Sequence, residues 1–172
     1  MDKKSLSEAD ICTKYITPAI VTAGWDLKNQ IRQEVYFTKG RVIVEGEKHR
    51  RGEPKKADYI LYYEGNIPIA IIEAKNNNHE IGSGIQQALE YGEILDIPFV
   101  YSSNGDGFIE HDRTGKSKKV ETELSLYQFP SPNELWNRYK ESKGLNKKNL
   151  ELLMEAVLKE TFEAWNESKP FI

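Results

Sequence analysis

The chain has 172 residues, enough for one domain with a core of ordinary size and too few for a second independent domain. Hydrophobic residues make up 38% and charged residues 30%, a balance that excludes both a disordered chain and one embedded in a membrane. The formal net charge of −3 gives no overall electrostatic sign of a nucleic-acid-binding protein.

Sulfur and imidazole ligands are scarce in this sequence. Cys12 is the only cysteine, so no disulfide forms within the chain, and the three histidines are too scattered for a zinc-finger type of site. Any metal should therefore be bound by oxygen. The N-terminus lacks the apolar segment of a signal peptide and no apolar run approaches membrane-spanning length, so we expect a cytoplasmic protein without a membrane partner.

Hydrophobic periodicity predicts alternating helices and strands. In chain order we expect a helix over 7–23, strands over 31–37 and 41–44, a hairpin with strands over 57–63 and 68–75, a helix over 83–95, and strands over 99–102 and 108–111. Beyond Gly115 we expect a polar linker and then helices over 132–139 and 147–165. We therefore divide the chain into a core over 1–115 and a C-terminal helical appendage over 116–172.

The hairpin carries the residues that suggest chemistry. Glu73 and Lys75 are two positions apart on one strand, so their side chains point to the same face. If Tyr63 lies opposite Pro68, Asp58 falls opposite Glu73, and two carboxylates and one ammonium group converge. Such a set could hold Mg²⁺ and hydrolyse a phosphodiester, because this cation prefers carboxylate oxygens. On spacing alone, an ordinary Glu/Lys pair at a half-exposed strand end is the better interpretation.

A basic segment precedes the first of these strands. Five cations and one anion lie within nine residues, the cations being Lys48, Arg50, Arg51, Lys55 and Lys56. They could bind DNA phosphates, and a solvated loop explains the run equally well.

Longer stretches of the sequence resemble a known family. The matching segments are Ala57-Asp58-Tyr59-Ile60-Leu61-Tyr62-Tyr63, Pro68-Ile69-Ala70-Ile71-Ile72-Glu73-Ala74-Lys75, Gln86-Gln87-Ala88-Leu89-Glu90-Tyr91, Ser102-Ser103-Asn104-Gly105-Asp106-Gly107-Phe108 and Asp112-Arg113-Thr114-Gly115. Together they resemble the N-terminal nuclease domain of the restriction subunit of type I restriction endonucleases. The resemblance covers roughly residues 5–115 and is far more specific than a three-residue motif.

That family belongs to the PD-(D/E)xK nucleases, and the resemblance implies its fold and site. We expect an α/β restriction-endonuclease-like core, a central mixed sheet flanked by helices. Asp58 corresponds to the motif's first acid, Glu73 to its second acid and Lys75 to its lysine, while Ala57 replaces the motif's proline without loss of a ligand. Mg²⁺ or Mn²⁺ would be held by Asp58, Glu73 and the carbonyl of Ala74.

Two further elements of the family pattern concern helices. Gln87 and Tyr91 match a Q-x-x-x-Y element and share a helix face, so the resemblance places them beside the site. The alternative is a core tyrosine and a surface glutamine. Glu8 is a candidate additional acid, as is Asp10, although we first expect Glu8 to close a capping box with Ser5. Glu34 could also approach the site or be an exposed strand residue.

The resemblance implies endonucleolytic cleavage of double-stranded DNA, a phosphodiester hydrolysis, within a complex that contains methylation and specificity subunits. ATP would be used only by translocase domains, and no G-x-x-x-x-G-K-[ST] loop occurs in this chain. We therefore expect an isolated domain or a part of a larger subunit. The alternative is a non-catalytic module that docks onto DNA or protein partners with the same fold.

Overall fold

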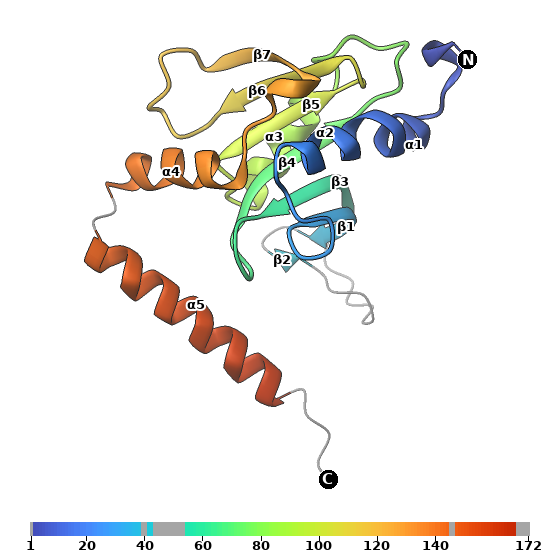
Figure 1. Cartoon of the computed structure of the whole chain (residues 1–172). Helices are drawn as coiled ribbons and strands as arrows, with labels where there is room; N and C mark the ends of the chain where they lie inside the picture. The colour runs from blue at the N-terminus through green and yellow to red at the C-terminus, as the bar shows by residue number, and fades with distance from the viewer. Residues whose placement is uncertain (1, 39–40, 43–53, 145–146, 168–172) are drawn as a thin grey trace.

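A seven-stranded mixed sheet forms the centre of the computed structural model (Figure 1). The structure describes residues 2–38, 41–42, 54–144 and 147–167. The strands are β1 (Ile31–Thr38), β2 (Arg41–Val42), β3 (Lys55–Tyr62), β4 (Pro68–Ala74), β5 (Phe99–Ser103), β6 (Gly107–Asp112) and β7 (Glu121–Ser125). Their order across the sheet is β2-β1-β3-β4-β5-β6-β7.

Strand β4 lies at the middle of this sheet. Its apolar run is buried almost throughout, because both faces of the strand are covered. It pairs antiparallel with β3 and parallel with β5, and helix α3 (Ile85–Ile94) makes the connection that a parallel pair requires. The carboxyl ends of β4 and β5 therefore meet at one edge of the sheet.

Helices cover both faces of the sheet. One face packs against α3, and the other packs against the N-terminal helix and α4 (Pro132–Lys143). The expected helix over 7–23 is present as α1 (Glu8–Ile11), a π-helical turn η2 (Cys12–Ile16) and α2 (Thr17–Thr22). Short 3₁₀ turns precede it at η1 (Lys3–Ser5) and follow β7 at η3 (Leu126–Gln128).

The region after Gly115 differs from the expected linker and appendage. β7 pairs with β6 and adds an edge strand to the sheet. Leu135 and Trp136 of α4 are buried in the main core, and the Trp25 indole donates a hydrogen bond to the Pro130 carbonyl at 2.9 Å. Helix α5 (Lys147–Glu167) runs away from α4 (Figure 1), with Leu153 packed against the main core and Val157 close to Gly65 in the β3–β4 turn. The strand and α4 therefore belong to the same core as the first 115 residues.

The expected α/β architecture is confirmed, and most strands lie within one or two residues of their predicted bounds. Of the strand expected at 41–44, only Arg41–Val42 lie within the described residues, and they form β2. None of the described helices is both long enough and apolar enough to cross a membrane.

Candidate active site

The β3–β4 hairpin brings Asp58 and Glu73 together. Tyr59 pairs with Ile72, and the same register continued by one residue sets Asp58 opposite Glu73, as predicted. The predicted pairing of Tyr63 with Pro68 is wrong by one residue, because an irregularity after Leu61 sets Tyr62 opposite Pro68. That shift lies at the far end of the hairpin and leaves the two acids facing one another.

Asp58 is oriented by the backbone of the neighbouring strand. Its Oδ2 atom accepts a hydrogen bond of 2.8 Å from the Ala74 amide. This bond fixes the Asp58 carboxylate next to the peptide that joins Glu73 and Ala74, so the two acids expected to hold a cation both lie beside Ala74.

Glu73 is the least solvated carboxylate of the site, with 3% of its surface exposed. Within the described part of the chain, its Oε2 atom is buried and has no hydrogen-bond partner. Burial and the negative charge of Asp58 raise the pKa of Glu73 to about 8, against the opposing effect of Lys75. An oxygen left in this condition is suited to bind a cation or to hold a proton.

Gly84 accounts for the burial of Glu73. A Cβ atom at this glycine would lie 3.1 Å from the Cγ atom of Glu73 and 3.0 Å from the hydroxyl oxygen of Ser102. The Gly84 amide instead donates a hydrogen bond of 3.0 Å to that hydroxyl. The absence of a side chain thus lets the start of α3 close over the ends of β4 and β5.

A chain of polar contacts links the end of β4 to α3. Lys75 Nζ lies 3.6 Å from Glu73 Oε1 and donates a hydrogen bond of 3.3 Å to Gln87 Oε1. Gln87 Nε2 in turn donates to the Tyr91 hydroxyl at 3.0 Å. Tyr91 is also a core residue, packed edge to face against Phe37 with ring centroids 5.0 Å apart. Tyr91 is therefore both a core residue and a neighbour of the candidate site, so the two alternatives expected for it are compatible.

Glu8 approaches the site from α1. Glu8 and Asp58 line a cavity of about 380 Å³ that also contains Glu34 and Lys56. Partial burial and the negative charge of Asp58 raise the pKa of Glu8. Glu8 thus shares the electrostatic environment of the site while its side chain remains accessible to solvent.

The expected capping box of Ser5 and Glu8 is wrong. The structure uses Ser7 and Asp10 instead, since Asp10 donates its amide to the Ser7 hydroxyl at 3.1 Å and its carboxylate accepts from the Ser7 amide. Ser5 donates its hydroxyl to the Asp2 carbonyl within η1. Asp10 is therefore occupied in capping, and Glu8 is left free of that role.

Of the candidate DNA-binding cations, Lys55 and Lys56 lie on β3, whereas Lys48, Arg50 and Arg51 lie outside the described residues. Lys55 pairs with Glu90 at 2.7 Å and lies 5.6 Å from the centre of the Tyr91 ring. Lys56 pairs with Glu34 at 3.1 Å. Both described lysines already have carboxylate partners, which a DNA phosphate would have to displace.

Glu34 has an unusual backbone that the sequence did not reveal. It lies between Gln33, which pairs with Tyr59, and Val35, which pairs with Ala57, so it is level with Asp58 on the next strand. Its φ angle of 51° is in the left-handed region, which costs a residue with a Cβ atom about 1 kcal/mol. The site therefore includes a strained strand position.

The candidate metal position offers carboxylate oxygens but not a dense cluster of ligating side chains. Among the described residues, no group of three or more His, Cys, Asp or Glu side chains is arranged to hold a metal ion. The carboxylates of Asp58 and Glu73 nevertheless supply oxygen donors, and the unpartnered Oε2 atom of Glu73 fits a hard cation that retains water ligands.

Without a divalent cation, Glu73→Gln should be more stable than the wild type above pH 5. The raised pKa means that folding opposes ionisation of Glu73, so the wild type loses stability as the pH rises from 4.5 towards 8, and the amide does not. We expect a melting temperature higher by about 5 °C at pH 8 and no difference near pH 4. Thermal unfolding of both proteins across this range measures the effect.

Glu93→Gln is the matched control for this measurement, because Glu93 is exposed on α3. It should unfold like the wild type at every pH. A Glu73→Gln protein that is not stabilised at pH 8 would contradict the raised pKa of this buried carboxylate.

The mixed sheet with helices on both faces defines a restriction-endonuclease-like α/β fold, and comparisons with known proteins identify the family. Residues 41–119 match the family described as type I restriction enzyme R protein N terminus. The type I restriction enzyme EcoAI endonuclease subunit of Escherichia coli is 47% identical over 156 residues, 90% of this chain and 19% of that protein.

A solved structure agrees with these matches. A fragment described as an HsdR subunit of a type I restriction enzyme from Vibrio vulnificus superposes with a TM-score of 0.72 and 41% identity, covering 87% of this chain and 28% of that one. The chain thus belongs to the family of type I restriction enzyme R protein N-terminal domains. It spans about a fifth of the length of the curated relative.

Proposed function

We propose that this chain is the nuclease domain of a type I restriction enzyme and cleaves double-stranded DNA with Mg²⁺ or Mn²⁺. The observation that carries the proposal is the buried Glu73 carboxylate with an unpartnered oxygen, opposite Asp58 and beside Lys75. The names of the relatives, which describe restriction endonuclease subunits, support the same activity.

In this proposal Asp58, Glu73 and the Ala74 carbonyl hold the cation. The ion supplies polarisation of a phosphoryl oxygen and a bound water of lowered pKa. Once Glu73 gives up its proton, the two carboxylates and the Lys75 ammonium group give the site a net negative charge, which favours binding of a divalent cation.

Lys75 orients the attacking water and stabilises charge that develops on the scissile phosphate. Its ammonium group is held between Glu73 and Gln87, and Gln87 is in turn held by Tyr91. Because Tyr91 is anchored in the core, the ammonium group is positioned by a rigid helix rather than by a loop.

Glu8 adds a third acid beside Asp58, where it binds a water or a cation directly. Lys55 and Lys56, and Lys48, Arg50 and Arg51 before them, contact DNA phosphates in the complex. Methylation and specificity subunits select the target, and ATP is used by translocase domains that this chain does not contain.

Titration with Mn²⁺ distinguishes this function from that of a non-catalytic docking module. We expect the chain to bind Mn²⁺ and Glu73→Ala to lose that binding, because the variant removes the oxygen without a protein partner. Isothermal calorimetry or electron paramagnetic resonance of free Mn²⁺ measures both. Glu93→Ala, on the exposed surface of α3, is the control and should bind as the wild type does. Binding that survives Glu73→Ala would favour the docking module.

A further inference from the structure

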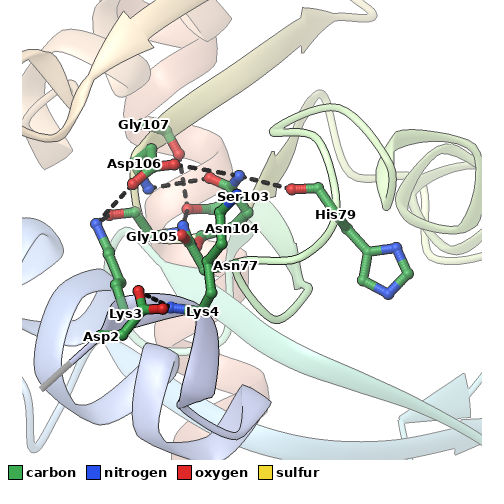
Figure 2. Close-up of polar contacts among 10 residues, drawn as sticks. All are labelled: Asp2, Lys3, Lys4, Asn77, His79, Ser103, Asn104, Gly105, Asp106 and Gly107. Carbon is green, nitrogen blue, oxygen red and sulfur yellow. Dashed lines mark hydrogen bonds and ion pairs between the residues drawn. The ribbon is translucent and has the colours of Figure 1, made fainter.

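Three segments that are distant in sequence meet beside the candidate site in one network of hydrogen bonds, which we call the polar junction (Figure 2). Its members are Lys3 and Lys4 at the N-terminus, Asn77, Asn78 and His79 after β4, and Asn104, Gly105 and Asp106 between β5 and β6. The Ser-Ser-Asn-Gly-Asp-Gly motif of the sequence supplies the last of these segments, and the proposed chemistry does not use it.

Asn104 is the centre of the polar junction and has 4% of its surface exposed. Its side chain donates to the His79 carbonyl at 2.8 Å and accepts from the Asp106 amide at 3.0 Å. Its own carbonyl accepts from the Asn77 side chain at 3.0 Å. The turn between β5 and β6 is thereby joined to the loop that follows Lys75, and the His79 imidazole points away from the network (Figure 2).

Lys3 connects this turn to the N-terminus. Its ammonium group donates to the Gly105 carbonyl at 2.6 Å, pairs with Asp106 at 2.7 Å and lies 4.0 Å from the centre of the Tyr15 ring. The Asn78 side chain makes a second connection, donating to the Lys4 carbonyl at 2.9 Å.

The turn also presses directly against α1. Gly105 has a φ angle of 85°, and a Cβ atom there would lie only 2.9 Å from the Cγ2 atom of Ile11, a fully buried residue of that helix. The packing of Ile11 holds the end of α1 against the β5–β6 turn, and the polar contacts of Lys3 and Lys4 hold the segment before the helix.

The position of the Glu8 carboxylate depends on how α1 is held. Among the described residues, no hydrogen bond or ion pair is made by its carboxylate, so its position relative to Asp58 is set by the backbone of α1. The segment that leads into α1 is held by Lys3 and by the Lys4 carbonyl.

We propose that Lys3, through its contacts with Gly105 and Asp106, is a positioning residue that places Glu8 beside Asp58 for DNA cleavage. The proposal rests on the proposed function. A rival role for the same lysine is direct contact with a DNA phosphate, and the two roles predict different responses to substitution of Asp106.

The test is a double-mutant cycle in the complete restriction assembly, with single-turnover cleavage of DNA at saturating concentration as the readout. Lys3→Ala should slow cleavage about tenfold, since small displacements of a catalytic group have effects of this size or larger. In a Glu8→Gln background, Lys3→Ala should cause no further loss, because there is no acid left to place. If Glu8→Gln leaves no measurable cleavage, Glu8→Asp is the background, and Lys3→Ala should then cause a smaller loss than in the wild type, because the shorter acid is already displaced.

Asp106→Asn separates the two roles of Lys3. A positioning role predicts slower cleavage, whereas a phosphate-binding lysine would be released from its carboxylate and bind DNA more tightly. Lys4→Ala is the matched control, because it removes the same charge from an exposed neighbouring side chain, and it should cleave as the wild type does.

Equal losses from Lys3→Ala with and without Glu8 would overturn the inference, as would wild-type cleavage by Lys3→Ala or by Glu8→Gln. The melting temperature of Lys3→Ala should change little, because a partly exposed ion pair contributes about 1 kcal/mol or less. The proposed function fails separately: it is rejected if Asp58→Asn still cuts DNA.

Discussion

Asp58→Asn, Glu73→Ala and Lys75→Ala should each reduce DNA cleavage by the complete restriction assembly at least about a hundredfold. The three side chains form one unit, in which Asp58 faces Glu73 and Lys75 Nζ lies 3.6 Å from Glu73 Oε1. In the proposed function, loss of either carboxylate weakens binding of the cation, and loss of the lysine removes the ammonium group that orients the attacking water. Gel assays of circular and linear DNA measure the loss.

The three variants should also be non-additive. Once one member of a unit is removed, the others contribute little, so Asp58→Asn/Lys75→Ala should be no slower than the worse of its parents. DNA binding and ATP hydrolysis by the assembly should remain, because neither uses these residues. Asp58→Asn is preferred to alanine since an amide oxygen still accepts the hydrogen bond from the Ala74 amide.

Glu64→Ala is the matched control for these substitutions. Glu64 is exposed in the turn at the other end of the same hairpin, so its removal changes the charge of the hairpin without touching the site. It should leave cleavage unchanged. Full cutting by any of the three site variants would remove that residue from the assignment.

Arg138→Leu should destabilise the fold by about 3–5 kcal/mol at pH 7. The Arg138 guanidinium donates to both oxygens of Glu110, at 3.1 and 2.7 Å, and to Asp112 at 2.9 Å. Both carboxylates are nearly buried, with 7% and 6% of their surfaces exposed, and the buried Tyr101 hydroxyl also donates to Glu110. Leucine would leave two buried negative charges without a counter-charge.

The effect of Arg138→Leu should depend on pH. Burial opposes ionisation of Asp112, but hydrogen bonds from Thr114 and Arg138 outweigh it and lower the pKa of Asp112. A lowered pKa contributes stability above the ordinary value near 3.8, and this contribution is lost as the pH falls. The difference between wild type and variant should therefore shrink below pH 4.

Urea unfolding at several pH values measures both expectations. Arg138→Lys should recover only part of the stability, because an ammonium group cannot bind a carboxylate through two parallel donors. Asn137→Ala, exposed on the same helix, is the control and should unfold like the wild type. An Arg138→Leu protein with the wild-type midpoint at pH 7 would show that Glu110 and Asp112 do not need Arg138 as a counter-charge.

Local patterns in the sequence were sufficient for most of the sheet and for the placement of Asp58 opposite Glu73, while the choice of these residues as a site came from the resemblance to a known family. The apolar run of β4 predicts a strand buried on both faces, and two-residue spacing puts Glu73 and Lys75 on one face. The antiparallel hairpin then brings Asp58 opposite Glu73. Helical spacing likewise places Gln87 and Tyr91 on one side of α3, where they contact each other. Each of these inferences uses residues that are close in sequence or joined by a short turn.

Ambiguous local signals misled the prediction at other positions. Two overlapping capping patterns, Ser5 with Glu8 and Ser7 with Asp10, are equivalent in spacing, and only the folded start of α1 selects the second. β7 was missed because it is a polar edge strand whose residues alternate between exposed and half-buried, so its apolar periodicity is weak.

By itself, the sequence determined most of the elements and the hairpin, because their signals are local periodicities and a short turn, whereas the choice of Asp58, Glu73 and Lys75 as a site came from the resemblance to a known family. Only the tertiary structure decided that Glu73 is buried and that its pKa is raised, since its burial depends on the close approach of Gly84 at the start of α3. Long-range packing likewise decided the contacts of Arg138 with β6 and of Lys3 with the β5–β6 turn. Such contacts join segments that no periodic pattern relates.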